Sequence, residues 1–597
     1  MFKNKQFILG VLIISFVVYL THIWINFFYI ATYNVDFSKY YDYLNYFLGV
    51  KVDIDFGQGV LYYYLISLSI NNKIELINIG NIDYVLSSSV HNVNLFLFMF
   101  GLIGIYRLLI FKKFDNLTIF ISILGLLIFP QTIYMRAVMK PEILCFATLP
   151  WVLLYLEKFI INKTNINLII PIPFLVIAIN TKGSVAGMIL LYLFVSYFKV
   201  FKILNIKNLL IVFLIFVSAL SIMQFENFRI TETSPLERPY DPEYDYKASP
   251  DIIFRFSPAE VIRNPFFEYD YQQNYYDIHS KSAINLIILD TFGDYFNQMF
   301  DMRQNYFSAN RKELIVNDSN LFINNKREIN YAGPFSSLLI QENYVRKLLS
   351  IFFSVAFYIL VLKYLYKDKE NRNFYIAPFF GIFILYLNAI GIPSNNFNPY
   401  KGDTFKAFYF SFFLSIAFVF VVSNILKNNP KFKLILVLLF GLLIIFVSGH
   451  PKNNSQFESE RLVAANEYSL FCSFNNILFF ENNLLKTLHA TGNINEYKSD
   501  CKNKSTSNLV FSINRADYDT NFKGDCVDEN NNLLYAVDKR NVSIERKCRI
   551  YTLELSNNEN INISKPYFAI FLLILTISLV IYETRVYEKI YRYNNKI

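Results

Sequence analysis

Apolar runs of about twenty residues recur along the whole chain, and no other feature of the sequence restricts the fold as much. A helix needs roughly 20 predominantly apolar residues to cross a bilayer. The chain has 597 residues, of which 54% are hydrophobic and only 17% are charged, and its mean hydropathy is +0.31. A soluble protein of this length would carry more charge and would divide into several domains. The sequence therefore predicts an all-α polytopic membrane protein.

We predict about twelve transmembrane helices. They fall at residues 7–30, 93–111, 117–134, 142–160, 167–181, 185–203, 208–224, 347–366, 374–392, 405–426, 433–449 and 566–583. The first run lacks a small-residue cleavage site and is longer than the core of a typical signal peptide. We therefore expect it to be retained as a membrane helix.

Basic residues in the short links between apolar runs predict the orientation. Cytoplasmic loops carry an excess of lysine and arginine, so the side that collects them is expected to face the cytoplasm. In this chain the links on one side contain Lys112, Lys113, Lys158, Lys163, Lys199, Lys202, Lys207, the segments 363–372 and 427–433, and the tail from Arg585. Both termini are then cytoplasmic, and a bacterial inner membrane is the expected location. The net charge of +9 belongs to these links and does not indicate nucleic-acid binding.

The opposite, extracytoplasmic side holds three long segments. The first covers 31–92, the second 225–346 and the third 450–565. The first contains the run VLYYYLISLSI, which is too short to span. We expect it to be a helix in the membrane interface, with tyrosines at headgroup depth. The domain division is then a transmembrane region over 1–449, an extracytoplasmic domain over 450–565, and a last helix with a cytoplasmic tail over 566–597.

Cysteine usage agrees with this topology. Four of the five cysteines lie in the third segment, and the fifth, Cys145, lies within a predicted helix. Four cysteines in one extracytoplasmic module favour two disulfides, with three pairings open. A metal site is the weaker interpretation, because no Cys-x-x-Cys spacing occurs. We expect a small α/β or β ectodomain with disulfides among Cys472, Cys501, Cys526 and Cys548.

Ionisable residues stand next to apolar runs at several predicted outer helix ends. They are Asp36 after the first helix, Arg136, Lys140 and Glu142 in the link between the third and fourth helices, Lys182 at the end of the fifth, and Lys406 at the start of the tenth. Charge at membrane depth is costly and therefore tends to mark substrate or ion sites. Cations can hold a phosphate, and a carboxylate can accept a proton from an attacking hydroxyl. The structural alternative stays open for each: a lysine can snorkel to the interface, and Asp36 can be a solvated loop acid.

In their order along the chain these residues resemble the polytopic GT-C glycosyltransferases, in particular the bacterial branch similar to protein O-mannosyltransferases and the lipid A aminoarabinose transferase. In that family an acidic motif follows the first helix, and a Leu-Tyr-Tyr segment on an interface helix comes about twenty residues later. Asp36 and the run Leu61 to Tyr64 match this order. The segment 180–184, Asn-Thr-Lys-Gly-Ser, is similar to the family's Lys-Gly turn, and Lys406 to Tyr409 matches a Lys-x-x-Tyr pattern that opens a later helix. The resemblance covers about residues 1–430.

The resemblance implies transfer of a sugar from a polyprenyl-phosphate sugar to a glycan, lipid or protein acceptor on the extracytoplasmic face, with inversion. Asp36 would be the catalytic base. The substrate-binding residues would be Arg136, Lys140, Glu142, Lys182, Lys406, Tyr62 and Tyr63, with Asp290 and Asp294 as secondary candidates.

The chain departs from the family pattern at three motifs, one of which is the acid after Arg136, displaced here to Glu142. Phe37 follows Asp36 where the family commonly has a second carboxylate, and Gly57-Gln58-Gly59 replaces His-Pro-Pro. Use of a divalent metal therefore stays open, and no cofactor is certain.

Two other classes of protein fit a chain with many membrane helices. An O-antigen polymerase or ligase also has about twelve helices and a large outer loop, but it relies on outer arginines. A transporter or flippase would show two related halves and broken helices near the midplane, and the sequence shows no such repeat. A third alternative is an inactive relative of the glycosyltransferases.

Overall fold

The computed structural model describes residues 2–28, 58–71, 82–231, 254–263, 282–293, 344–389, 405–431 and 565–594, together with short pieces at 31, 40, 43–44, 46–47, 269–270, 275–276, 433, 477–479 and 552–554. Within these ranges the chain is mainly helical, as predicted. The helices of the N-terminal half are α1 (Phe2–Phe28), α3 (Leu61–Asn71), α4 (Ile82–Phe111), α5 (Asn116–Ile128), α6 (Pro130–Ala137), α7 (Ile143–Asn162), α8 (Ile166–Ile169), α9 (Pro171–Ile179), α10 (Gly183–Ser196), α11 (Phe198–Ile203) and α12 (Ile206–Thr231).

The later elements include short helices as well as long ones. They are α14 (Pro258–Arg263), α15 (Ala283–Thr291), α18 (Tyr344–Lys367), α19 (Arg372–Ala389), the 3₁₀ helix η4 (Ala407–Phe410), α20 (Ser411–Asn428) and α26 (Tyr567–Asn594). Two antiparallel strand pairs occur: β1 (Tyr269–Asp270) with β2 (Tyr275–Tyr276), and β3 (Ile477–Phe479) with β4 (Thr552–Glu554).

The chain is an integral membrane protein with several apolar helices. Among the described residues, five helices are long and apolar enough to cross a membrane, or six if the bent pair α5–α6 counts as one span. They are Leu86–Phe111, Ile143–Asn162, Ile206–Thr231, Ser350–Lys367 and Ala407–Asn428. A helix or helix pair occupies every predicted range except 433–449, of which only Lys433 is described. The total of twelve spans stays a prediction.

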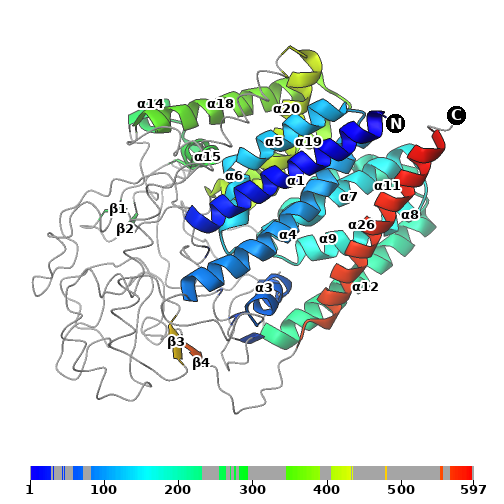
Figure 1. Cartoon of the computed structure of the whole chain (residues 1–597), viewed down its shortest axis with the longest axis horizontal. Coiled ribbons are helices and arrows are strands. Elements are labelled where there is room, and N and C mark those ends of the chain that lie inside the picture. The colour runs from blue at the N-terminus through cyan, green and yellow to red at the C-terminus, as the bar shows by residue number, and fades with distance from the viewer. Residues whose placement is uncertain are drawn as a thin grey trace, which may run out of the picture.

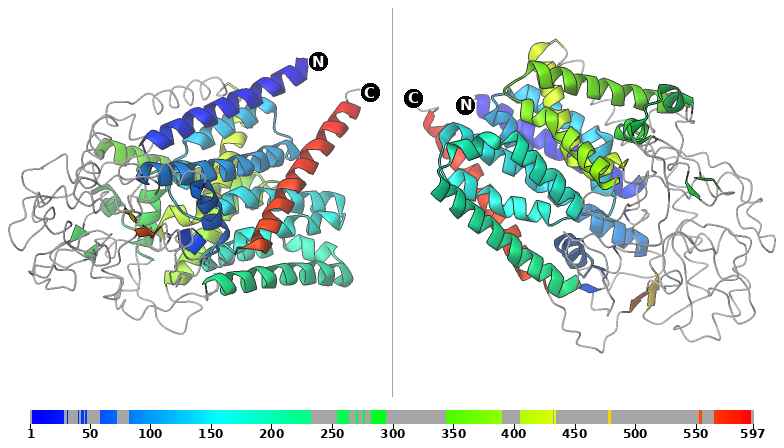
Figure 2. Two further views of the ribbon diagram at one scale, coloured as in Figure 1. Left: turned by 60° about the horizontal axis from the view of Figure 1, so that its bottom comes forward. Right: turned by 180° about the vertical axis from the view of Figure 1, so that it is seen from behind.

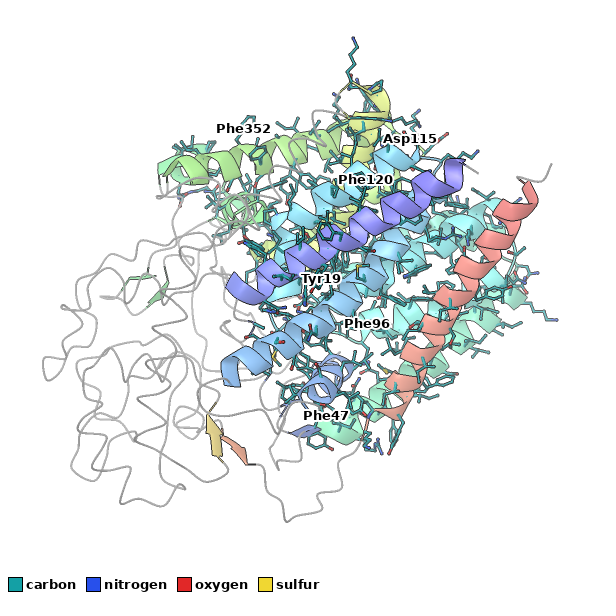
Figure 3. The ribbon with its side chains drawn as sticks, viewed as in Figure 1. Tyr19, Phe47, Phe96, Asp115, Phe120 and Phe352 are labelled. Atoms are coloured by element: carbon teal, nitrogen blue, oxygen red, sulfur yellow. The ribbon has the colours of Figure 1, made fainter. Side chains whose placement is uncertain are left out.

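The long helices lie side by side in one oblique bundle (Figure 1). The N- and C-termini lie at the same end of this bundle, and α3 lies towards the other end. Helices α12 and α26 pack on each other at one flank (Figure 2). Apolar side chains such as Tyr19, Phe96 and Phe352 point outward and are 57%, 46% and 64% exposed (Figure 3). Such a surface suits a lipid environment.

Helix α4 begins at Ile82, eleven residues before the predicted span at 93. The added turns contain polar residues, which hid them from a search for apolar runs. The structure buries several of these residues in contacts with neighbouring helices: His91 is hydrogen-bonded to Asn26 of α1 (2.7 Å) and to the carbonyl of Ala137 at the end of α6 (2.9 Å), and Ser87 accepts from the amide of Ala31 (3.1 Å). Part of the predicted first outer segment is thus helix packed against α1 and α6.

The predicted span 117–134 is broken into α5 and α6, which meet at an angle of 61°. Pro130 occupies the first position of α6, where a missing N–H costs nothing, but it cannot continue the helix before it. The break sets the direction of the link that carries Lys140 and Glu142. Pro171 divides α8 from α9 in the same way.

Close backbone contact between α4 and α7 forms the centre of the bundle. A β-carbon on Gly101 would lie 2.5 Å from the carbonyl oxygen of Phe146, and one on Gly104 would lie 2.9 Å from the indole nitrogen of Trp151. Small residues at such crossings let membrane helices approach closely. This packing fixes the start of α7, where Glu142 is located.

Ion pairs join several helices at the end of the bundle where the termini lie. Glu583 of α26 pairs with Arg107 of α4 (2.7 Å) and Lys158 of α7 (2.6 Å), and Glu157 pairs with Lys112 (2.7 Å). Many of the basic links used to predict orientation meet at this end, which also carries Asp115 (Figure 3).

Asp115 caps α5 at this end by accepting from the amide of Thr118 (3.0 Å), and its side chain pairs with Lys433 (2.8 Å). Burial raises the pKa of Asp115, but the hydrogen bonds from Lys433 and Thr118 outweigh this effect and lower the pKa to about 2. Asp115 is therefore charged at neutral pH.

Most of the predicted ectodomain lies outside the described residues. Strands β3 and β4 pair chain segments near its two ends. The four cysteines Cys472, Cys501, Cys526 and Cys548 are not among the described residues, so the disulfides stay a prediction.

Candidate functional site

Three of the predicted lysines gather around one aromatic ring. The ammonium nitrogens of Lys182, Lys140 and Lys406 lie 4.5, 5.3 and 5.9 Å from the ring centre of Tyr409. The distance between any two of these nitrogens is therefore no greater than the sum of their distances to the ring centre. Cations are attracted to the face of an aromatic ring, so Tyr409 offsets part of the repulsion among three like charges. We call these four residues the lysine cluster.

The lysine cluster is assembled from three separate chain segments. Lys140 lies in the link after α6, Lys182 is the residue before α10, and Lys406 is the residue before η4. Lys140 and Lys406 are 1% and 4% exposed, whereas Lys182 is partly exposed. The α10 helix adds the positive end of its dipole next to Lys182, a position that favours an anion. The arrangement suits an anion such as a phosphate, approached from the side of Lys182.

The turn that carries Lys182 is held by the start of α3 and by α12. The amide of Gly59 donates to the carbonyl of Thr181 (3.1 Å). The side-chain oxygen of Asn180 accepts from Asn227 (2.8 Å) and Gln224 (2.6 Å), both on α12. Asn227 in turn accepts from the amide of Val60 (3.3 Å). The helix predicted from the Tyr-rich run is α3, and its start packs against the turn that carries Lys182.

The two predicted tyrosines of α3 have different neighbours. Tyr62 donates to Asn94 of α4 (2.8 Å), and Asn94 donates to the carbonyls of Arg136 (3.0 Å) and Val138 (3.1 Å). Burial raises the pKa of the Tyr62 hydroxyl, and the nearby charge of Glu142 adds to the rise. Tyr62 therefore stays protonated and ties α3 to the Lys140 link.

Tyr63 turns away from this link. Its hydroxyl donates to Gln58, and its ring stacks on Tyr43 with 4.4 Å between the ring centres.

Glu142 is the residue before α7 and is fully buried. Neither of its carboxylate oxygens has a hydrogen-bond partner among the described residues. A buried carboxyl group in this condition is costly. It lies two residues after Lys140 in the chain, and its charge is near enough to Tyr62 to raise the pKa of that hydroxyl.

Arg136 is directed elsewhere. Its guanidinium donates to Thr21 of α1 (2.8 Å) and to the carbonyl of Leu127 in α5 (2.7 Å), and it lies 4.7 Å from the ring centre of Phe98. These contacts join α1, α5 and α6 across the break at Pro130. The structure therefore places Arg136 in helix packing, and its predicted substrate contact stays a prediction.

Of the remaining predicted site residues, the structure describes Asp290 but not Asp36 or Asp294. Asp290, near the end of α15, accepts from the amide of Ala407 (2.7 Å), directly after Lys406. Asp36 and Asp294 lie outside the described residues, so the predicted base is not placed. Within the described ranges no group of three histidine, cysteine or acidic side chains is arranged to hold a metal ion. Metal use stays open.

Sequence reasoning identified the three lysines but not the ring that joins them. The Lys-x-x-Tyr spacing from Lys406 to Tyr409 was the available signal, because a 3₁₀ turn brings residues three apart onto one side. Asn94 was not singled out, and Gly59 was noted only within the Gly-Gln-Gly segment that departs from the family pattern. Comparison of the chain with protein-family models, with curated proteins and with solved structures finds no match.

Proposed function

We propose that the chain is a membrane glycosyltransferase that moves a sugar from a polyprenyl-phosphate sugar to a glycan, lipid or protein acceptor at the extracytoplasmic face of a bacterial inner membrane. The observation that supports this most is the lysine cluster at a helix N-terminus. The lysine cluster lies at one end of the bundle. The termini and the paired charges of Glu583 and Glu157 lie at the other end. A lipid-linked phosphate needs a cationic site at membrane depth, and buried cations there are otherwise costly.

The proposed chemistry assigns binding to the lysines and proton transfer to Asp36. The acceptor hydroxyl attacks the anomeric carbon, and its proton passes to the Asp36 carboxylate. The bond between that carbon and the phosphate oxygen breaks, and its electron pair stays on the phosphate. Lys140, Lys182 and Lys406 stabilise the developing charge, which is commonly the largest contribution to such catalysis.

The experiment uses the full-length protein in nanodiscs, with a polyprenyl monophosphate as the binding probe. Each of Lys140→Gln, Lys182→Gln and Lys406→Gln is expected to weaken binding of this probe about tenfold or more, because a charged hydrogen bond is lost. Asp36→Asn is expected to bind the probe normally and to lose sugar transfer. Lys363→Gln, a basic residue on the predicted cytoplasmic side, is the matched control.

The donor and acceptor are identified from the lipids of a deletion strain. We expect one envelope glycan to lose a sugar while its polyprenyl-phosphate sugar accumulates. Normal probe binding by all three lysine variants would exclude the lysine cluster as a phosphate site. An Asp36→Asn protein that loses transport of a lipid-linked sugar, with transfer intact, would favour the transporter or flippase alternative.

A further inference from the structure

The end of α15 is fixed between the broken helix α5–α6 and helix α18. The side-chain amide of Gln131 donates to the carbonyls of Asp290 (2.7 Å) and Thr291 (3.2 Å). The amide of Phe292 donates to Ser354 of α18 (3.1 Å), and the ring of Phe292 packs on Phe129 with 5.1 Å between ring centres. A segment of the predicted second outer loop is therefore part of the packed bundle.

Asp290 uses this anchored position to cap η4. Its side chain is 1% exposed, and one carboxylate oxygen accepts from the amide of Ala407, the first residue of η4. Lys406, which precedes η4, makes no side-chain capping hydrogen bond to it. The first amides of a helix need such acceptors, so α15 supplies the cap that the local sequence lacks.

The turn held in this way carries two of the four residues of the lysine cluster. Lys406 lies immediately before Ala407, and Tyr409 lies two residues after it. A shift of η4 would move the ring that Lys140 and Lys182 face. We propose that Asp290 is a positioning residue of the donor-phosphate site, which holds η4 so that Lys406 and Tyr409 face the other two lysines. The role in donor binding rests on the proposed function, whereas the position of η4 does not.

Two substitutions separate positioning from chemistry. Asp290→Asn keeps an oxygen that can accept from Ala407, and it is expected to bind the polyprenyl monophosphate probe within about threefold of the wild type. Asp290→Ala removes the acceptor and is expected to raise the dissociation constant of the probe about tenfold or more, the equivalent of one charge-assisted hydrogen bond. Asp115→Ala is the matched control, because Asp115 also caps a helix with its carboxylate but lies at the other end of the bundle.

A second measurement follows η4 independently of activity. Lys406 is 4% exposed, so an amine-acetylating reagent applied to the full-length protein in nanodiscs should label it slowly, as read by mass spectrometry. In Asp290→Ala its labelling should rise several-fold, whereas Asp290→Asn and Asp115→Ala should match the wild type. If Asp290→Ala does not accumulate, Asp290→Ser, with a shorter side chain, takes its place.

The two measurements distinguish the ways in which the idea can fail. Unchanged labelling of Lys406 in Asp290→Ala would overturn the positioning role. Normal labelling of Asp290→Asn with loss of transfer would also overturn it, because the carboxylate would then act chemically. Increased labelling of Lys406 in Asp290→Ala with normal probe binding would support the role of Asp290 in positioning η4. It would overturn the assignment of the lysine cluster as the phosphate site.

Discussion

Buried charged residues near the lysine cluster differ in how far their polar atoms are satisfied. Arg136, which is 2% exposed, donates to two carbonyls and a hydroxyl, so the fold compensates its burial. Glu142 is just as buried, and its carboxylate oxygens have no hydrogen-bond partner within the described ranges. Within the described part of the chain, Glu142 forms no ion pair with Lys140, which precedes it by two residues. Unsatisfied groups of this kind are uncommon and are often tied to function.

Replacing Glu142 by methionine, an apolar residue of similar volume, should therefore stabilise the protein and impair it. We expect the free energy of unfolding to rise by about 1–3 kcal/mol, the usual cost of a buried polar group without a partner, and sugar transfer to fall. Thermal unfolding in detergent and a transfer assay measure the two effects. Glu157→Met is the control, because Glu157 pairs with Lys112 and its loss should lower stability. A destabilised Glu142→Met protein would mean that Glu142 already has a partner.

Contacts between elements position the lysine cluster, and they depend on residues without charge. The start of α3 reaches the turn before α10 because Gly59 has no side chain. A β-carbon at Gly59 would lie 2.2 Å from the backbone oxygen of Asn180, a distance that only a backbone shift can relieve. Gly59 thus allows the close approach of the start of α3 to the turn that carries Lys182.

The substitution Gly59→Ala should separate α3 from this turn. Overpacking of this kind costs about 1–3 kcal/mol, and we expect weaker binding of the polyprenyl monophosphate as well as a lower unfolding temperature. Gly187→Ala is the matched control, since its β-carbon would meet only the side chain of Ile384 at 3.8 Å, and alanine favours a helix interior. Equal behaviour of the two variants would contradict the role of Gly59.

The same contacts show which parts of the fold and the site could be predicted from sequence. Apolar length located the membrane helices, and the lysines stood out because charge at membrane depth is costly. The early start of α4 was missed because Ser87 and His91 interrupt the apolar pattern, although tertiary hydrogen bonds compensate them. The Lys-x-x-Tyr spacing pairs Tyr409 with Lys406 alone, and the convergence of Lys140 and Lys182 on the same ring leaves no pattern in the sequence.

At the scale of the whole molecule, ion pairs between helices gather at the end of the bundle where the termini lie. At the end with the termini, buried cations meet carboxylates: Glu583 binds Arg107 and Lys158 and also accepts from Tyr155 (3.2 Å). At the other end, cations gather on an aromatic ring. The ion pairs thus join α4, α7 and α26 at the first end, and three lysines from separate chain segments face the ring of Tyr409 at the second.

Glu583 is the residue through which α26 joins this paired end. Replacing it with methionine leaves Arg107 and Lys158 buried without their carboxylate, which should cost about 3–5 kcal/mol of unfolding free energy. Replacing all three by methionine should recover most of this loss, because an apolar cluster of similar volume avoids the uncompensated charge. Thermal and denaturant unfolding in detergent measure both.

The exposed pair of Asp115 and Lys433 provides the control for this prediction. The Asp115 side chain is 55% exposed, so Lys433→Met should change stability by about 1 kcal/mol or less. Below their unfolding temperatures all these variants should bind the polyprenyl monophosphate as the wild type does, because the other end of α26 is still held by Glu226, which accepts from the amides of Phe568 (2.7 Å) and Ala569 (2.9 Å). Weakened probe binding in a folded Glu583→Met protein would mean that the two ends are coupled, and that α26 transmits the state of the paired charges to the lysine cluster.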